Sequence, residues 1–193
     1  MLVGIGIVIV GIIIAVIISS NMDANEKIES DTNALATLPD FSASLVHHAV
    51  TGSKNSLALS VDQQKFAILP CEGEPRVFDF DQLVAVEVEQ NGSTLTKTNR
   101  GSQAAGAAIG GALLGPAGLI VGGLSGSSRQ VEKVSSLALK IYTNDLMKPV
   151  YTVSFIDLGT ASLDANNALL KEHYQNLDEW YGRFRTILAM RPA

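Results

Sequence analysis

The sequence predicts a mainly β domain covered by one carboxyl-terminal helix and preceded by a membrane-spanning helix. Three observations predict this class: an uncharged apolar run at the amino terminus, a series of short alternating segments separated by turn residues, and a long segment with helical periodicity near the carboxyl end. The chain has 193 residues, which is enough for one domain and an accessory segment. Hydrophobic residues make up 47% and charged residues only 17%, so a disordered chain is excluded.

Composition also excludes several kinds of ligand. The net charge is −5, whereas proteins that bind nucleic acid normally present a basic face to the phosphates. Anionic lipid headgroups are disfavoured for the same reason. Cys71 is the only cysteine, so it forms no internal disulfide, and no spacing of histidine and cysteine predicts a structural zinc site. We expect no cofactor, no metal and no nucleic-acid partner.

Residues 1–21 are predicted to anchor the chain in a membrane. Residues 2–18 contain no charge and no hydroxyl group. As a helix they rise about 26 Å, close to the hydrocarbon thickness of roughly 30 Å. The alternative is a cleaved signal peptide, but no Lys or Arg precedes the run and no small-residue cleavage pattern follows it. The expected lipid-facing anchor positions include Leu2, Ile5, Ile9, Ile13 and Ile17.

Residues 22–40 are predicted to be a tether with a short helical turn, closed by Pro39. They are rich in Asn, Asp, Glu, Ser and Thr and contain no aromatic residue. Lys27 favours a cytoplasmic location for this side of the anchor, because the positive-inside rule counts Lys and Arg and largely ignores acids.

The domain is predicted to occupy residues 41–193 and to begin with a series of strands. Residues 84–89 alternate apolar and acidic side chains, and Asn91-Gly92 then supplies the positive φ angles of a two-residue hairpin turn. One face of this strand is therefore expected to be buried and the other wet. The remaining predicted strands are residues 56–61, 65–69, 76–80, 94–98, 135–142 and 150–156, with an edge strand within 42–50.

A helix is predicted from about residue 163 to residue 190. Its apolar positions recur at spacings of four and three, which places them on one face. Seven or eight antiparallel strands followed by one such helix describe a small barrel or sandwich, with an open end or face covered by the helix. The apolar stripe consists of Leu170, Tyr174, Leu177, Tyr181, Phe184 and Leu188.

A glycine-rich insert at residues 103–128 interrupts the strands. Its central residues, 104–124, carry no charge, and glycines recur four residues apart, a pattern that lets helices pack closely. Pro116 is expected to divide it into two short helices. The glycines predicted to form an oligomer interface are Gly106, Gly110, Gly111, Gly115, Gly118, Gly122 and Gly126.

Three structures compete for this insert. A single membrane span fits its length but not its Gly and Pro content or its need to return to the strands. A flexible linker, or a hairpin packed on its own domain, is easy to insert in a loop. We favour a helical hairpin that dips into the bilayer or packs against copies of itself, because a solvated linker does not usually carry so many aliphatic side chains.

Three stretches, at residues 78–88, 97–101 and 110–124, resemble bacterial and prophage proteins with a pleckstrin-homology-like (PH-like) domain, of the kind often found beside short SHOCT-type oligomerisation motifs. The similarity covers approximately residues 41–190. It implies a seven-stranded barrel capped by a carboxyl-terminal helix, with the glycine-rich insert between two strands. It implies no catalytic residue. With the predicted anchor, we expect a single-pass protein of the bacterial inner membrane. The membrane helix and the absence of a SHOCT tail depart from the resemblance.

No group of residues predicts catalysis. His47 and His48 are adjacent, so on a strand they point to opposite faces and do not chelate a metal together. No base is predicted beside Cys71, which excludes an activated nucleophile at the level of sequence.

We therefore expect a non-enzymatic, membrane-anchored scaffold that self-associates through the insert, with a ring or pore as an extension. The alternative is a monomeric adaptor that binds a membrane-protein partner by its barrel edge. A phage exclusion or defence role is compatible with the resemblance.

Overall fold

The computed structural model describes residues 24–49, 55–70, 73–99 and 133–190. The predicted anchor at residues 1–21, the insert at 103–128 with all seven zipper glycines, and Cys71 lie outside the described residues. Within the ranges that are described, no helix is long and apolar enough to cross a bilayer.

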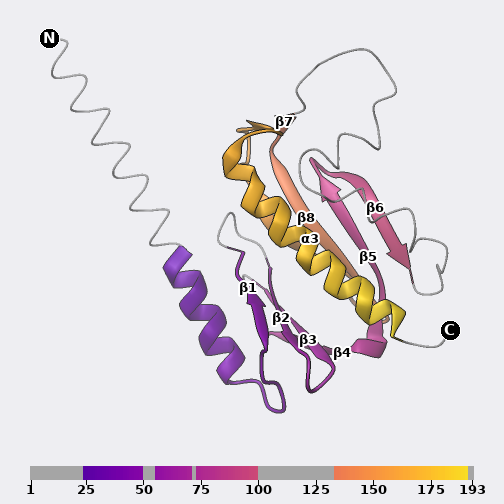
Figure 1. The fold of residues 1–193 in the computed structure, drawn as a ribbon. Helices are drawn as coiled ribbons and strands as arrows, with labels where there is room; N and C mark the ends of the chain where they lie inside the picture. The colour runs from indigo at the N-terminus through magenta and orange to yellow at the C-terminus, as the bar shows by residue number, and fades with distance from the viewer. Residues whose placement is uncertain (1–23, 50–54, 71–72, 100–132, 191–193) are drawn as a thin grey trace, which may run out of the picture.

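Two four-stranded antiparallel sheets form the body of the domain (Figure 1). The first has the order β1-β2-β3-β4 and the second has the order β6-β5-β8-β9. A two-stranded sheet pairs β7 with β10. The elements are β1 (Leu45–His47), β2 (Ser56–Ser60), β3 (Lys65–Leu69), β4 (Arg76–Asp79), the 3₁₀ turn η1 (Phe80–Gln82), β5 (Leu83–Gln90), β6 (Ser93–Asn99), β7 (Lys133–Val134), β8 (Ser136–Thr143), β9 (Val150–Asp157), β10 (Leu163–Asp164) and α3 (Ala168–Ala189).

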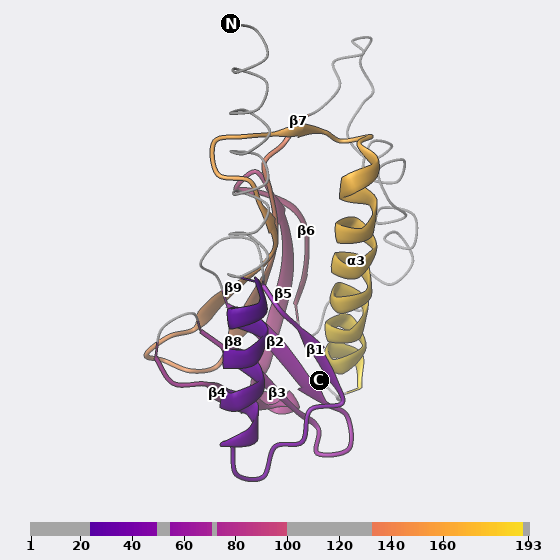
Figure 2. The same ribbon diagram turned by 90° about the vertical axis from the view of Figure 1, so that its left-hand side faces the viewer.

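Helix α3 covers one face of the second sheet, as both ribbon views show (Figures 1 and 2). The Asn167 side chain caps its start by accepting a hydrogen bond from the Leu169 amide. The predicted apolar stripe is buried along its whole length. Tyr181 also donates to or accepts from Thr98 on β6 at 2.7 Å, so the helix is joined to the sheet by a polar contact as well as by apolar packing.

The predicted strand positions are confirmed, but the predicted barrel is not closed. Among the described residues, the two sheets are joined by an isolated bridge between Asn55 and Val153 and not by a continuous ladder. The chain passes from the first sheet to the second through η1, where the Asp79 amide donates to the Gln82 side chain. The edge strands are β1 and β4 in the first sheet and β6 and β9 in the second, and among the described residues no ladder pairs an edge of one sheet with an edge of the other.

Residues 24–36 form a helix, which is longer than the short turn expected within the tether. It packs on the first sheet through Ala34 and Leu35, on the face opposite the main core. Asp31 is 2% exposed and lies between Lys27 at 2.5 Å and His48 at 2.9 Å. The polar composition of this segment made it resemble a tether. In the helix its charged residues point outward or pair with one another, and its few apolar residues share one face.

The turn between β5 and β6 also holds the segment that follows the insert. Asn91 has φ 51° and Gly92 has φ 76°, as a two-residue hairpin turn requires. The Asn91 side chain donates to the Lys133 carbonyl at 2.6 Å and accepts from the Ser135 amide at 2.8 Å. The strand that leaves the insert is therefore fixed to the end of β5.

Candidate binding site at the β8–β9 turn

The turn between β8 and β9 projects two apolar side chains into solvent. Asp145 organises it, because its carboxylate accepts from the Met147 amide at 2.8 Å. At the base of the turn, the Thr143 amide donates to the Pro149 carbonyl at 2.8 Å. Leu146 is 97% exposed and Met147 is 91% exposed. We call these two residues the apolar tip.

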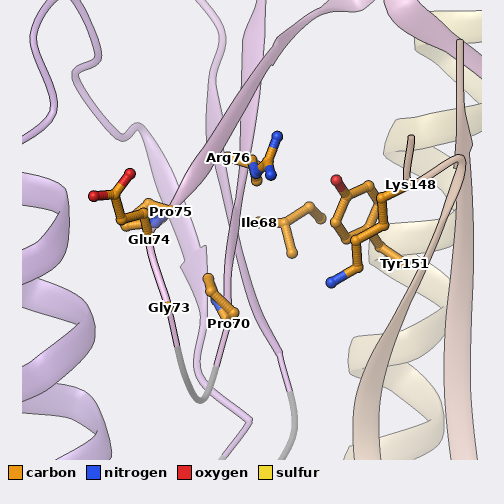
Figure 3. A pocket seen from close by; sticks show the side chains of 8 residues that line it. All are labelled: Ile68, Pro70, Gly73, Glu74, Pro75, Arg76, Lys148 and Tyr151. Atoms are coloured by element: carbon orange, nitrogen blue, oxygen red, sulfur yellow. The ribbon is translucent and has the colours of Figure 1, made fainter. Parts of the chain in front are cut away.

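A cavity of about 550 Å³ lies beside the apolar tip. Figure 3 shows Lys148 and Tyr151 on one side of it and the turn after β3 on the other, with Ile68 and Arg76 between them. Its volume is within the usual range for small-molecule sites. The lining residues are Ile68, Pro70, Gly73, Glu74, Pro75, Arg76, Lys148 and Tyr151.

The Tyr151 hydroxyl is the unusual group in this cavity. The residue is only 2% exposed, yet among the described residues its hydroxyl has no hydrogen-bond partner. Buried polar groups are nearly always bonded, so this hydroxyl is a candidate contact for a ligand in the cavity. Burial raises the pKa of Tyr151 above its usual value. The hydroxyl is therefore protonated at neutral pH and can donate a hydrogen bond.

Charges of both signs surround this hydroxyl. The Lys148 ammonium lies 4.9 Å from the centre of the Tyr151 ring. Arg76 lies 3.8 Å from Asp145, a long contact for an ion pair, and its side chain is 58% exposed. Glu74 lines the opposite wall. The site thus combines two cations, two carboxylates and a neutral donor.

The two histidines have structural positions. The His47 ring stacks on Phe155 with centroids 4.0 Å apart, and its Nε2 lies 2.9 Å from the Ser154 carbonyl. Its Nδ1 lies 3.2 Å from the Asn176 amide nitrogen. His48 instead contacts Asp31 of the helix over residues 24–36. The adjacent side chains therefore point to opposite faces, as the strand predicted, and each is occupied by a different contact.

Glu87 is the other buried charged group of the second sheet. Burial raises the pKa of this carboxyl, but hydrogen bonds from Thr94, Tyr142 and Lys97 outweigh it, so that the pKa of Glu87 is lowered overall. The contacts with Tyr142 and Lys97 measure 2.8 and 3.4 Å. This cluster joins β5, β6 and β8 and is saturated by its own partners.

The described residues contain no cluster of three or more His, Cys, Asp or Glu side chains suited to a metal ion. Sequence analysis did not find the cavity, because its walls come from β3, β4 and β9 and meet only in the fold. One signal was present in the sequence. Leu146-Met147 stands between Asn144-Asp145 and Lys148-Pro149, so an apolar pair occupies the centre of a polar turn.

Comparisons with known proteins cover most of the β domain. A family model described as "Glycine zipper containing PH domain" matches residues 46–157. The chain is 28% identical over 123 residues to the immunity protein of Bacillus phage SPbeta, covering 60% of this chain and 58% of that protein.

A second relative is the SPbeta prophage-derived uncharacterized membrane protein YomJ of Bacillus subtilis (strain 168). It is also 28% identical over 123 residues, covering 60% of this chain and 52% of that protein. The match therefore spans little more than half the length of either curated relative. No solved structure matches the chain significantly.

Proposed function

This chain belongs to the family of PH domains that contain a glycine zipper, and from that premise we propose that it is a non-enzymatic, membrane-anchored immunity module whose copies associate through the glycine-rich insert. Residues 1–21 anchor it in the bacterial inner membrane, with the domain on the cytoplasmic side. The insert at residues 103–128 is the contact between copies. The names of the relatives, an immunity protein and a prophage membrane protein, support this context.

The positions of the two ends of the insert carry this proposal. Asn99, the last residue of β6, pairs opposite Ala85 near the start of β5. Lys133 resumes the fold beside Asn91, just beyond the other end of β5. The distance along β5 is about 20 Å at roughly 3.3 Å per residue. About seven extended residues cover that distance.

Residues 100–132 are therefore several times longer than a connection requires. A segment that only had to connect the end of β6 to the start of β7 would not need this length or regularly spaced glycines. The surplus favours an insert with a role of its own, and close helix packing between copies is the role for which four-residue glycine spacing is suited. A ring of such hairpins is the natural extension, because symmetry buries apolar surface that one copy would expose. A pore within that ring would be lined by aliphatic side chains and would constrict by dewetting.

A second candidate is a monomeric adaptor that adds a partner strand to an open sheet edge. The order of the second sheet leaves β6 and β9 at its edges. Most of β6 is exposed and polar, which suits an edge strand that awaits a partner chain. This function requires no contact between inserts.

Mass in mild detergent separates the two functions. We expect the full-length protein to be a discrete oligomer by light scattering corrected for bound detergent, and deletion of residues 104–124 to yield monomers. Gly111→Leu combined with Gly118→Leu should also dissociate it, because the added side chains block close helix approach. Ala112→Leu adds similar bulk off the glycine spacing and should preserve the oligomer.

The same variants, expressed in a host bacterium, should lose protection against a superinfecting phage in parallel with assembly. A full-length, unsubstituted protein that is itself monomeric would overturn self-association and favour the adaptor. Assembly that survives the two glycine substitutions would show that the zipper is not the interface.

A further inference from the structure

We infer that the apolar tip and the cavity beside it form a second membrane contact, in which Leu146 and Met147 enter the lipid interface and the cavity receives the headgroup of a zwitterionic phospholipid. This inference rests on the membrane location proposed above and is independent of the insert.

The apolar tip has the form of an insertion loop. Two adjacent aliphatic side chains, at 97% and 91% exposure, are held outward by a turn that Asp145 organises from within. The next most exposed aliphatic residue described is Leu169, at 70%. Exposure of both tip side chains is unfavourable in water and becomes favourable at the acyl boundary of a bilayer. Lys148 follows the tip directly, where its long side chain can reach the headgroup region.

The cavity supplies what a phosphate group requires. The Tyr151 hydroxyl is buried, protonated and without a partner among the described residues, so it has a hydrogen bond to donate. Lys148 and Arg76 line the same cavity and provide positive charge. The Arg76 contact with Asp145, at 3.8 Å, is long enough to leave the guanidinium available to a better-placed anion.

The balance of charge selects a zwitterion over a polyanion. Glu74 lines the cavity and Asp145 lies beside Arg76, so the two carboxylates offset the two cations. Such a site offers no net attraction to a multiply charged anionic headgroup but matches a headgroup with one phosphate and one ammonium, in which Glu74 faces the ammonium. This agrees with the net charge of −5, which disfavours an anionic lipid surface.

The order of the groups favours a lipid over a soluble ligand. In a phospholipid the phosphate is the first charged group outside the acyl region. In the protein, Lys148 is both the residue next to the apolar tip and a wall of the cavity. Tip and cavity therefore follow each other in the same order as acyl chain and phosphate. A phosphorylated peptide would use the cavity and leave the tip in water.

Depth-dependent fluorescence quenching tests the tip. The full-length protein with Cys71→Ser and Met147→Cys carries an environment-sensitive fluorophore and is reconstituted into phosphatidylethanolamine–phosphatidylcholine vesicles that contain nitroxide-labelled acyl chains. We expect strong quenching at position 147. The matched control is the same label at Leu169→Cys on α3, also an exposed aliphatic position, where we expect little quenching.

Tyr151→Phe tests the headgroup site without disturbing the fold, because the hydroxyl that it removes has no partner to lose among the described residues. We expect it to weaken binding of soluble phosphorylethanolamine by about tenfold, the effect of one hydrogen bond to a charged group. It should also reduce quenching at position 147. Galactolipid lacks phosphate. In vesicles of galactolipid, a labelled protein that keeps Tyr151 should therefore show the same reduction of quenching at position 147 as the Tyr151→Phe variant.

Each failure has a distinct meaning. Equal quenching at positions 147 and 169 in a membrane-bound protein overturns this inference and leaves the proposed function intact. A protein that remains in the soluble fraction overturns the membrane location instead. Binding of phosphorylethanolamine or of a phosphopeptide without quenching at the tip overturns the lipid and assigns the cavity to a soluble ligand.

Discussion

At the scale of single residues, the buried side-chain polar atoms of the described residues have hydrogen-bond partners, with the Tyr151 hydroxyl as the exception. His47 and Glu87 both lie inside the fold and have hydrogen-bond partners: His47 donates to the Ser154 carbonyl and contacts Asn176 of α3, and Glu87 accepts from Tyr142. Tyr151 is as deeply buried but has no such partner among the described residues. Burial without a partner carries a free-energy cost of about 1–3 kcal/mol, so a stable domain tolerates it where a ligand completes the bond.

His47 should make the domain sensitive to mild acid. Burial lowers the pKa of His47 below its ordinary value of 6.5. The unfolded chain therefore binds more protons below about pH 6.5, and the free energy of unfolding falls as the pH drops through that value. We expect the urea midpoint of the full-length protein in mild detergent, followed by Trp180 fluorescence, to be lower at pH 5.5 than at pH 7.

Two substitutions test whether His47 causes this pH dependence of stability. His47→Phe keeps the stack on Phe155 but cannot be protonated, so it should remove much of the difference between the two pH values. It should also cost about 1 kcal/mol at pH 7, since Asn176 loses a partner. His48→Gln should keep the difference. If the urea midpoint differed between pH 5.5 and pH 7 by the same amount in His47→Phe and in the unsubstituted protein, another group would be responsible for the pH dependence.

At the scale of elements, the turn between β5 and β6 connects the β domain to the segment that follows the insert. Asn91 combines a left-handed backbone with side-chain bonds to the segment that follows the insert. Since β6 enters the insert and β7 leaves it, Asn91 contributes to fixing the return point of the chain, together with the pairing of β7 with β10.

Asn91→Gly isolates the side-chain bonds, because glycine adopts the left-handed backbone at no steric cost. We expect it to lower the free energy of unfolding by about 1–3 kcal/mol, the sum of the lost side-chain bonds. Amide hydrogen exchange should increase first at residues 133–136. Gly92→Ala is the control: it has open space around the new Cβ but a φ of 76°, so it should cost about 1 kcal/mol without selective exchange at 133–136. If amide hydrogen exchange in Asn91→Gly increased equally throughout the domain, Asn91 would not be holding residues 133–136 to the turn.

Local pattern predicted the strands and α3 well, because alternation and the four-and-three spacing are properties of the chain itself. Residues 84–89 form a strand and residues 170–188 form a helix, as predicted. The expected wet face of the strand is wrong at Glu87, which is buried, and the helix begins at Ala168 and not near residue 163, where β10 lies. The open arrangement of the sheets was not predictable, because it depends on η1 and on which edges β5 uses. Nor was the cavity, since Arg76 and Tyr151 lie on different strands and only the fold brings them together.

At the scale of the whole molecule, three features are proposed to act at a membrane: the predicted anchor, the glycine-rich insert and the apolar tip. Each feature would have a different role. The anchor would fix the chain to one bilayer, the insert would join copies, and the tip would set the distance and tilt of the domain. A tip that contacts lipid requires the domain to lie close to the bilayer, and the helix over residues 24–36, packed on the first sheet, leaves little free chain between anchor and domain.

The side of the membrane on which the domain lies decides which leaflet the tip contacts, and Lys27 predicts the cytoplasmic side. In full-length protein with Cys71→Ser and Leu169→Cys, the new thiol lies on an exposed position of α3. A membrane-impermeant maleimide should label it in inverted membrane vesicles but not in intact cells. Labelling in intact cells would place the domain outside and the tip on the outer leaflet.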